Sequence, residues 1–517
     1  MDSRPNKPSL GFFLAIALLV QFYSRFAGAP FVDFALDDWR LLELGRSCSG
    51  LGDAWAMVLR WPDRPVGTGL LLSTFHLFDD WTAGYAIFGI VCNSAMLALT
   101  MLLVYTLTGD TRECFLAGMV FALVPNLTES YQWATMIPYG PGFVAYVAAA
   151  LCWLRFTRGK SPFNLVASAL LFGVGLATYE VGVALPFVLL FLENRRSWRR
   201  AAVACATLVG VCLVYIAWRS TGGFGTANNL LFPHRAVGFG LSDVIWNAKE
   251  IVRWWVGGRM GDTILNGLAG FDTLPLHQQR MFALISILTT AGICVLITRS
   301  EPGNKTPREA MPAGRVFLFA LAWAAGTQVV SLVSWTGGRL NYLPAVGVAI
   351  GAAVLLNRIP ARHWLVPAFP IILVCLAANQ GTSAQWRDSA SFQRNIFEYL
   401  ARHERAWADR ELVVFNTTQL CQRQAKHLVQ PSLNDPSAWA NYGNVGLMRG
   451  FALNSMLHLI RPGMTRPAGI LDAEHGAHVE GDILAWHAWY DPRTQNRTAL
   501  TNVFMVDCLA VGSGRQE

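Results

Sequence analysis

The sequence predicts an α-helical membrane protein with about eleven transmembrane helices and a small soluble domain at its carboxyl end. Of its 517 residues, 53% are hydrophobic and only 14% are charged, whereas soluble globular proteins carry about a quarter charged residues. Disordered chains show the reverse pattern, with low hydrophobicity and high charge. Apolar segments also recur between residues 10 and 378, and about 20 apolar residues suffice to cross a bilayer as a helix. A purely soluble enzyme and a disordered chain are both excluded.

The eleven expected spans begin close to the amino terminus. The first follows Arg4 and Lys7; a cleaved signal peptide ending at Ala27-Gly28-Ala29 is the alternative, but the number of later spans favours a retained helix. In chain order the spans are residues 10–28, 81–107, 114–125, 138–153, 163–178, 181–192, 201–218, 281–298, 316–333, 342–356 and 364–378.

Two of these segments, residues 114–125 and 181–192, have only twelve residues each. At 1.5 Å per residue such a helix is about 18 Å long, too short to cross a bilayer unaided. Short or broken helices at membrane depth pack against other helices or line a water-filled cavity. We therefore expect a site in the outer half of the bundle.

The distribution of basic residues predicts the orientation. With a cytoplasmic amino terminus, sixteen Lys and Arg fall in cytoplasmic segments and only Arg339 falls in a short outward loop, as the positive-inside rule requires. Residues 29–80, residues 219–280 and the tail then face outward, which is the periplasm if the membrane is a bacterial inner membrane. The cytoplasmic segments carry a net charge of +10 and the rest of the chain carries −2, which together give the net charge of +8. The basicity thus reflects topology and does not indicate nucleic-acid binding.

The tail predicts a separate extracytoplasmic α/β domain, residues 379–517, after a transmembrane domain of residues 1–378. An amphipathic helix is expected over 386–410, strands over 411–416 and 502–507, and a helix over 439–460. Cys421 and Cys508 are the only cysteines in the tail. Because this side is oxidising, we predict a disulfide between them. A His-x-x-His pattern at His475 and His478 has no matched third ligand, so a solvated loop is favoured over a metal site.

The first outward loop contains the acids Asp33, Asp37 and Asp38 within about ten residues of the first span. A carboxyl group beside an apolar span has a raised pKa, which suits a general base. On a helix Asp37 and Asp38 point apart, so one would meet a substrate while the other holds Arg40 or a cation. The alternative is an ordinary acidic helix start, since Asp is common at N-caps.

Other outward loops bring further charged and aromatic residues to the same membrane face. Charged groups at membrane depth are usually functional, although a structural ion pair is the alternative for Glu180 and Arg339, and the interfacial belt is the alternative for aromatic residues. Guanidinium groups match phosphate in two-point geometry. The candidate phosphate-binding residues are Arg339, Arg64, Arg219, Arg253 and Arg259, and the candidate cavity residues are Trp39, Glu129, Tyr131, Trp133, Tyr139, Tyr179, Glu180 and Tyr342.

The order of these motifs resembles the GT-C class of polytopic glycosyltransferases, which take a sugar from a polyprenyl-phosphate carrier. This class includes protein O-mannosyltransferases, the aminoarabinose transferase of lipid A and O-antigen glucosyltransferases. The resemblance covers roughly residues 10–378. It consists of one span, an outward Asp37-Asp38-Trp39 motif, Arg64-Pro65 in the same loop, Tyr179-Glu180 at a short span, and a turn with Arg339, Tyr342 and Pro344.

The resemblance implies an inverting transfer of sugar to a hydroxyl acceptor at the outer membrane face. Asp37 or Asp38 would serve as the general base or as a ligand of a divalent cation, Mg²⁺ or Mn²⁺, and Arg339 would be the first choice to hold the leaving phosphate. The partners would be a polyprenyl-phosphate-linked sugar, membrane lipid, and a glycan, lipid or protein acceptor. Two alternatives stay open: a lipid-linked saccharide flippase or transporter, and a catalytically silent GT-C-like assembly protein.

Overall fold

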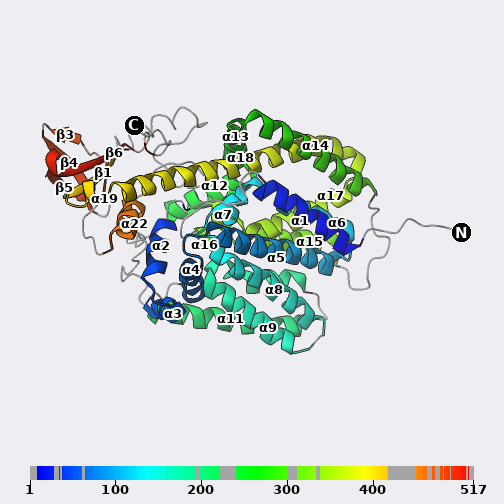
Figure 1. Ribbon diagram of the computed structural model, residues 1–517. Helices are drawn as coiled ribbons and strands as arrows, with labels where there is room; N and C mark the ends of the chain where they lie inside the picture. Colours follow the sequence, from blue (N-terminus) through cyan, green and yellow to red (C-terminus); the bar gives the residue numbers. More distant parts are fainter. Residues whose placement is uncertain are drawn as a thin grey trace.

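A computed structural model describes the fold of most of the chain (Figure 1). The described residues are 9–27, 34, 38–60, 64–159, 161–193, 197–221, 240–299, 311–332, 338–416, 450–462, 468–471, 478–480, 482–488, 491–507 and 511. The helices that match the predicted spans are α1 (Leu10–Phe26), α5 (Thr82–Thr108), α6 (Thr111–Leu123), α8 (Gly140–Thr157), α9 (Phe163–Thr178), α10 (Leu185–Leu189), α11 (Trp198–Thr221), α14 (Leu276–Arg299), α15 (Ala313–Gly326), α17 (Pro344–Arg358) and α18 (Ala361–Arg402).

The described residues form a polytopic membrane protein. By length and composition, six helical segments can cross a membrane: 82–108, 137–157, 198–219, 276–299, 313–332 and 363–402. Shorter apolar helices are α1, α9, α17 and α4 (Pro65–Phe78). The mostly helical membrane fold predicted from composition is therefore confirmed. The orientation in the membrane stays a prediction.

The helices pack around a large apolar core with α6 at its centre, in contact with α1, α5 and α17. Local sequence sets where these helices begin and end. The side chain of Ser9 caps α1 by accepting a hydrogen bond from the Phe12 amide, and Asp110 caps α6 through the Arg112 amide. Gly109 ends α5 in the left-handed conformation, with φ of 69°, which glycine adopts without steric cost. The tight turn between α5 and α6 thus follows from two neighbouring residues.

The two short predicted spans are both interrupted. Helix α6 has 13 residues and gives way to a 3₁₀ turn, η1 (Pro125–Leu127). Residues 180–192 consist of η3 (Glu180–Gly182), the five-residue helix α10 and η4 (Leu190–Leu192). A continuous membrane-length α-helix occurs in neither segment, so buried backbone groups there need partners from neighbouring elements.

Between the spans lie shorter elements that the sequence places on the outward side. The first loop forms α2 (Asp38–Ser47), α3 (Leu51–Arg60) and α4, and the long second loop contributes α12 (Leu241–Val256) and α13 (Gly258–Asp272). Further short elements in these loops are α7 (Thr128–Gln132) and η5 (Gly338–Asn341), whereas η2 (Ile137–Tyr139) and α16 (Val329–Leu332) fall at the ends of the predicted spans 138–153 and 316–333. In Figure 1, α2 and α4 lie at the end of the bundle from which α18 emerges.

Helix α18 joins the membrane part to the tail without a break. Its 42 residues extend about 63 Å at 1.5 Å per residue, and Figure 1 shows it running along the bundle and on to the strands. The predicted boundary after residue 378 falls inside this helix. At that level α13 crosses it closely: a Cβ on Gly267 would lie 2.4 Å from the Ala378 carbonyl oxygen. The two parts are therefore joined by a helix and not by a loop.

The tail contains two small sheets of three strands each. Parallel strands in the order β2-β1-β6 form the first sheet, and antiparallel strands β3-β4-β5 form the second. The predicted strands 411–416 and 502–507 correspond to β1 and β6. The remaining tail elements are α19 (Glu404–Trp407), α22 (Gly450–Ile460), β1 (Leu412–Asn416), β2 (Ala468–Leu471), β3 (His478–Glu480), β4 (Ile483–Ala488), β5 (Asp491–Ala499), η6 (Leu500–Asn502) and β6 (Val503–Asp507).

Two predictions for the tail lie outside the described residues. Cys421 and Cys508, the predicted disulfide pair, are among the residues not described, and so are residues 439–449 of the predicted helix. The described part of that helix, α22, packs against α2 of the first loop. There the Nδ1 atom of His458 lies 2.9 Å from Oε1 of Glu43.

Candidate anion-binding site after helix α9

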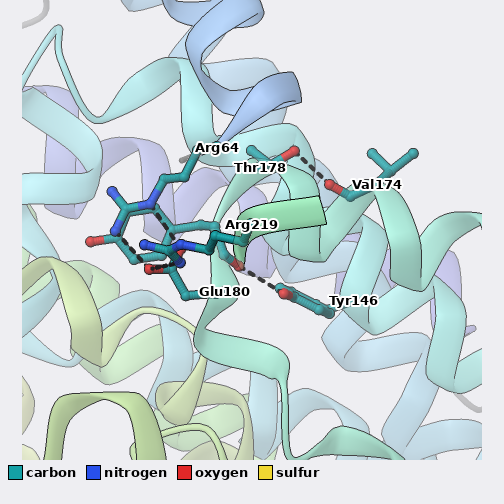
Figure 2. A network of polar contacts seen from close by, with 7 residues as sticks. Arg64, Tyr146, Val174, Thr178, Glu180 and Arg219 are labelled. Atoms are coloured by element: carbon teal, nitrogen blue, oxygen red, sulfur yellow. Dashed lines mark hydrogen bonds and ion pairs between the residues drawn. The ribbon is translucent and has the colours of Figure 1, made fainter. Parts of the chain in front are cut away.

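Two arginines and one glutamate meet where α9 ends (Figure 2). The Nε and Nη2 atoms of Arg64 donate to the two carboxylate oxygens of Glu180 at 2.8 and 3.0 Å. Nη1 of Arg219 lies 3.1 Å from Oε1 of the same carboxylate. The three residues come from the N-cap of α4, the 3₁₀ turn η3 and the last turn of α11. All three were predicted from the sequence as site residues.

Specific contacts stabilise the non-helical backbone just before Glu180, where α9 ends. Thr178 ends α9 with its hydroxyl donating to the Val174 carbonyl at 2.7 Å, and Tyr179 follows in an extended conformation. The hydroxyl of Tyr146 donates to the Tyr179 carbonyl at 2.7 Å, so this backbone oxygen is satisfied although the helix has ended. A Cβ on Gly182 would lie 2.3 Å from the Tyr146 ring, so only glycine allows the ring to reach in.

The cluster carries a net charge of +1. Burial raises the pKa of Glu180, but the Arg64 and Arg219 guanidinium groups outweigh this and bring the pKa to about 2, below the ordinary 4.5. Burial lowers the pKa of Arg64, and Glu180 more than reverses that effect. Arg64 also stacks over the Tyr179 ring, with its Cζ 4.1 Å from the centroid. All three groups are charged at neutral pH, and the two cations exceed the single anion.

The positive cluster lies at the end of an apolar groove. The groove runs between α9 and α11, is open to the outside, and has a volume of about 550 Å³. Val66 at one end of the groove is two residues from Arg64, and Ala177 is three residues before Glu180. Arg219 lies eight residues beyond Val211 on α11, about 12 Å along that helix. The groove is lined by Val66, Leu165, Val166, Ala169, Leu170, Gly173, Val174, Ala177, Thr207 and Val211.

This combination suits a phosphate on an apolar chain. The bidentate pair with Glu180 uses two of the five N–H donors of Arg64, and guanidinium groups bind phosphate through paired donors. The side chains of Arg64 and Arg219 are 18% and 19% exposed, so both remain accessible from one side. The arrangement can hold an anionic head group at the end of an apolar groove.

Asp38, one of the two predicted catalytic acids, lies in the protein interior. It is 1% exposed, and its Oδ1 accepts hydrogen bonds from the Thr135 amide at 2.7 Å and the Thr135 hydroxyl at 2.5 Å. The neighbouring Trp39 is fully buried and donates to Oε1 of Gln393 on α18 at 3.1 Å. Arg40, the expected partner of one acid, pairs with Glu43 at 2.6 Å. Asp37 lies outside the described residues.

The aromatic residues predicted to line the cavity lie in two separate regions, one at the Arg64 cluster and one in the core of the bundle. Tyr139 packs edge-on against Tyr179, with ring centroids 5.2 Å apart, and so belongs to the Arg64 cluster. Tyr131 and Tyr342 pack together in the core, with centroids 6.1 Å apart. Trp133 packs against Trp386 of α18. Tyr131, Trp133 and Tyr342 thus join the loops to the bundle interior and do not meet the Arg64 cluster.

The buried Arg25 of α1 was not predicted from the sequence. Its guanidinium donates to Oδ1 of Asn379 at 2.8 Å and to the Val124 carbonyl, and it lies over the Tyr131 ring at 4.8 Å. It occupies the carboxyl end of the first span, where the positive-inside rule gives no reason to expect a cation. An arginine on the outward end of a span is the signal that could have identified it.

Of the remaining predicted arginines, two form a second cluster, and the side chain of the third is not among the described parts of the structure. Arg253 and Arg259 both pair with the buried Glu250, at 2.7 and 2.9 Å. The structure describes the backbone of Arg339 and Glu129 but not their side chains. Among the described residues, His, Cys, Asp and Glu side chains do not come together in groups of three or more.

The fold defines a class of protein, a mostly helical polytopic membrane protein, and the Arg64–Glu180–Arg219 cluster lies where its helix α9 ends. Neither a protein-family description nor a curated protein matches the sequence. Over about 90% of its length the chain is structurally similar to ArnT.

Two crystal structures of ArnT from Cupriavidus metallidurans show this likeness. For ArnT bound to undecaprenyl phosphate, the identity is 12%, the alignment covers 89% of each chain, and the TM-score is 0.44. For the apo state, the identity is 13%, the coverage is 93% of this chain and 96% of that chain, and the TM-score is 0.38. At these values the likeness concerns the course of the backbone alone, and we transfer neither a substrate nor a site residue from it.

Proposed function

We propose that the protein is a glycosyltransferase that moves a sugar from a polyprenyl-phosphate donor to a hydroxyl acceptor at the outer, periplasmic face of a bacterial inner membrane. The observation that carries this proposal is the position of the Arg64–Glu180–Arg219 cluster at the end of the α9–α11 groove. A polyprenyl phosphate has the same two parts, a long apolar chain and a terminal anion. The positive-inside distribution of Lys and Arg supports the outward orientation.

In this proposal Arg64 and Arg219 hold the donor phosphate. The groove between α9 and α11 takes the isoprenoid units next to the phosphate, since its lining is apolar. The net charge of +1 favours the phosphate in its ground state and stabilises it further as a leaving group. Arg339 stays the candidate for a third contact on the grounds of its sequence position in an outward turn, since its side chain lies outside the described residues.

The acceptor hydroxyl attacks the anomeric carbon from the side opposite the phosphate. The new C–O bond forms as the C–O bond to phosphate breaks, and the phosphate leaves with the electron pair. The hydroxyl proton passes to a carboxylate. We assign this base to Asp37, because Asp38 is buried and already accepts two hydrogen bonds from Thr135. Displacement from the opposite side inverts the sugar configuration. Dependence on Mg²⁺ or Mn²⁺ is a separate proposal, tested by chelation and metal restoration.

The binding step is tested with undecaprenyl phosphate and undecaprenol, which differ only in the phosphate. We expect undecaprenyl phosphate to raise the thermal unfolding midpoint of the purified protein more than undecaprenol does. A hydrogen bond to a charged group contributes about 1.5–3 kcal/mol, so Arg64→Gln and Arg219→Gln should each weaken undecaprenyl phosphate binding by about tenfold to a hundredfold. Arg46→Gln is the matched control, because Arg46 pairs with Asp79 on the exposed side of the first loop.

The groove is tested separately with Gly173→Leu. A Cβ at this position would lie 3.5 Å from Cγ1 of Val211, so a leucine side chain fills the groove without a backbone clash. Binding of both lipids should weaken, whereas the selectivity for phosphate should persist. Equal binding of undecaprenyl phosphate and undecaprenol by the wild-type protein would contradict the proposed donor site.

The reaction is tested with a panel of undecaprenyl-phosphate sugars in reconstituted vesicles. Release of undecaprenyl phosphate that depends on Asp37 supports transfer. Movement of the intact donor across the bilayer without its consumption would indicate the flippase alternative. Binding without either outcome would indicate a catalytically silent assembly protein.

A further inference from the structure

Helix α12 presents an apolar face to the outside of the described protein. Leu241, Ile245, Val252 and Val256 are 76%, 61%, 59% and 84% exposed. Their spacing of four, seven and four residues puts all four on one side of an α-helix. Scattered exposed apolar residues need no explanation, but four on one face form a continuous surface.

The opposite side of α12 is fixed to the rest of the protein. Asn247 donates to the Leu332 carbonyl of α16 at 3.1 Å, and the Trp254 carbonyl accepts from Asn126 of η1 at 3.2 Å. Glu250 is 3% exposed and pairs with Arg259 of α13. The helix is therefore already docked through its polar side, and its apolar face points away from these contacts.

Cationic and aromatic groups flank the apolar face on one side. Lys249 is exposed and lies with its Nζ 5.6 Å from the centroid of the Trp246 ring, which is itself 55% exposed. The Arg253 side chain, next to Lys249 by helical spacing, is 37% exposed. Lys, Arg and Trp beside an apolar face are typical of helices that lie in the membrane–water interface.

Helix α12 is followed by α13, which packs against α18 near residue 378, where the last predicted span ends. The following helix, α13, packs on α18 through Gly267 and Gly270, which face Ala378 and Gly381. Residue 378 is the end of the predicted last span. Helix α14, which is long and apolar enough to cross a membrane, begins at Leu276, four residues after α13 ends. If the last span ends at residue 378 as the sequence predicts, the α12–α13 pair is expected at the level of the membrane surface.

We propose that α12 lies in the interface of the outer leaflet, with its apolar face among the lipid chains, and that Lys249 and Arg253 bind the phosphate groups of anionic lipids. The occupant of this face is the bilayer, because the flanking cations complement lipid phosphates and the helix lies at the end of the spans. This inference does not depend on the proposed glycosyl transfer, since it concerns the surface of the protein opposite the Glu250 contact.

The position of the helix is tested by a photo-crosslinking amino acid, benzoylphenylalanine, in place of Val256 in the full-length protein in nanodiscs. We expect adducts with lipid, identified by mass spectrometry. The same amino acid in place of Arg402, which is exposed and lies 24 residues beyond the predicted end of the last span at residue 378, should give no lipid adduct. A peptide adduct at position 256, or no lipid adduct there, would overturn the proposal.

The lipid preference is tested with phosphatidylglycerol and phosphatidylcholine. Phosphatidylglycerol should bind the wild-type protein more tightly, and Lys249→Gln should reduce that preference by about fivefold. Arg402→Gln, at a position remote from α12, is the matched control and should leave the preference unchanged. Because each preference is a ratio measured on one protein, a loss of stability in the variant does not mimic the effect. An equal preference in wild-type and Lys249→Gln protein would refute the lipid-phosphate assignment.

Discussion

Replacing Glu180 by glutamine removes the one carboxylate between two arginines. The side chain is 13% exposed and makes contacts of 2.8, 3.0 and 3.1 Å with Arg64 and Arg219. Glutamine keeps the shape and one acceptor oxygen but not the charge. We therefore expect Glu180→Gln to destabilise the ligand-free protein while making the cluster more positive, from +1 to +2.

The expected size follows from the pKa of Glu180. Its fall from 4.5 to about 2 in the folded protein, at about 1.4 kcal/mol for each pH unit, corresponds to roughly 3 kcal/mol. This agrees with the cost of about 3–5 kcal/mol for breaking a buried pair. Because the folded pKa is the lower one, this stability is present above about pH 4.5 and is lost as pH falls towards 2. The wild-type protein should thus lose its advantage over Glu180→Gln in that interval.

Thermal unfolding followed by tryptophan fluorescence at pH 7 and at pH 3.5 measures this effect. The unfolding midpoint of Glu180→Gln should be several degrees lower at pH 7, and the difference should shrink at pH 3.5. The variant should also bind undecaprenyl phosphate about tenfold more tightly, because the phosphate replaces the missing anion. An unchanged midpoint would refute the stability argument, and weaker phosphate binding would refute the assignment of the cluster as the donor site.

Three further predictions concern other parts of the chain. Asp37→Asn should lower the rate of sugar transfer by a factor of about 10² or more and leave the unfolding midpoint unchanged. Asp38→Ala should lower the unfolding midpoint, because the buried Thr135 amide loses its hydrogen-bond partner. Activity and thermal unfolding assays on both variants distinguish these two effects. Burial raises the pKa of Glu43, but His458, Ser455 and Arg40 bring it to about 2. Glu43→Gln should therefore loosen α22 from α2 at pH 7, as limited proteolysis would show, and the difference from the wild-type protein should become smaller as pH falls from 4.5 towards 2. Gly182→Val should displace Tyr146 and lower the unfolding midpoint, with Gly210→Val as the control because space around Gly210 is open.

Hydrophobic segments could be found from sequence because burial in lipid requires long apolar runs in the chain itself. The spans 82–108, 163–178 and 344–358 were predicted within a few residues for this reason. Residues 114–125 and 181–192 were predicted to form helices too short to cross a bilayer unaided, and neither segment forms a continuous membrane-length α-helix. Helix α4 was not recognised as an apolar helix, because it follows the polar Arg64-Pro65 motif in a loop assigned to solvent. The continuity of α18 across residue 378 was also missed, since a change in composition does not end a helix.

Four of the candidate residues named from the sequence lie together in the structure, but the way in which they pair could not be predicted. Arg64, Tyr179, Glu180 and Arg219 were all identified because charged and aromatic groups at membrane depth are rare. Asp38 was given a catalytic role on the same grounds, although its carboxylate is directed to the Thr135 backbone inside the fold. A carboxylate beside a span has the same local sequence whether it faces a cavity or caps a neighbouring loop. The difference depends on residue 135, almost a hundred positions away.

The sequence by itself determined that the chain is a helical membrane protein, which way its basic loops are expected to point, and which residues carry charge at membrane depth. These properties depend on runs of neighbouring residues. The tertiary structure alone decided that Arg64 and Arg219, 155 positions apart, share Glu180, that an apolar groove ends beside them, and that α12 turns its apolar face outward. These properties depend on how α4, α9 and α11 pack, and packing between distant helices is not encoded in any single segment.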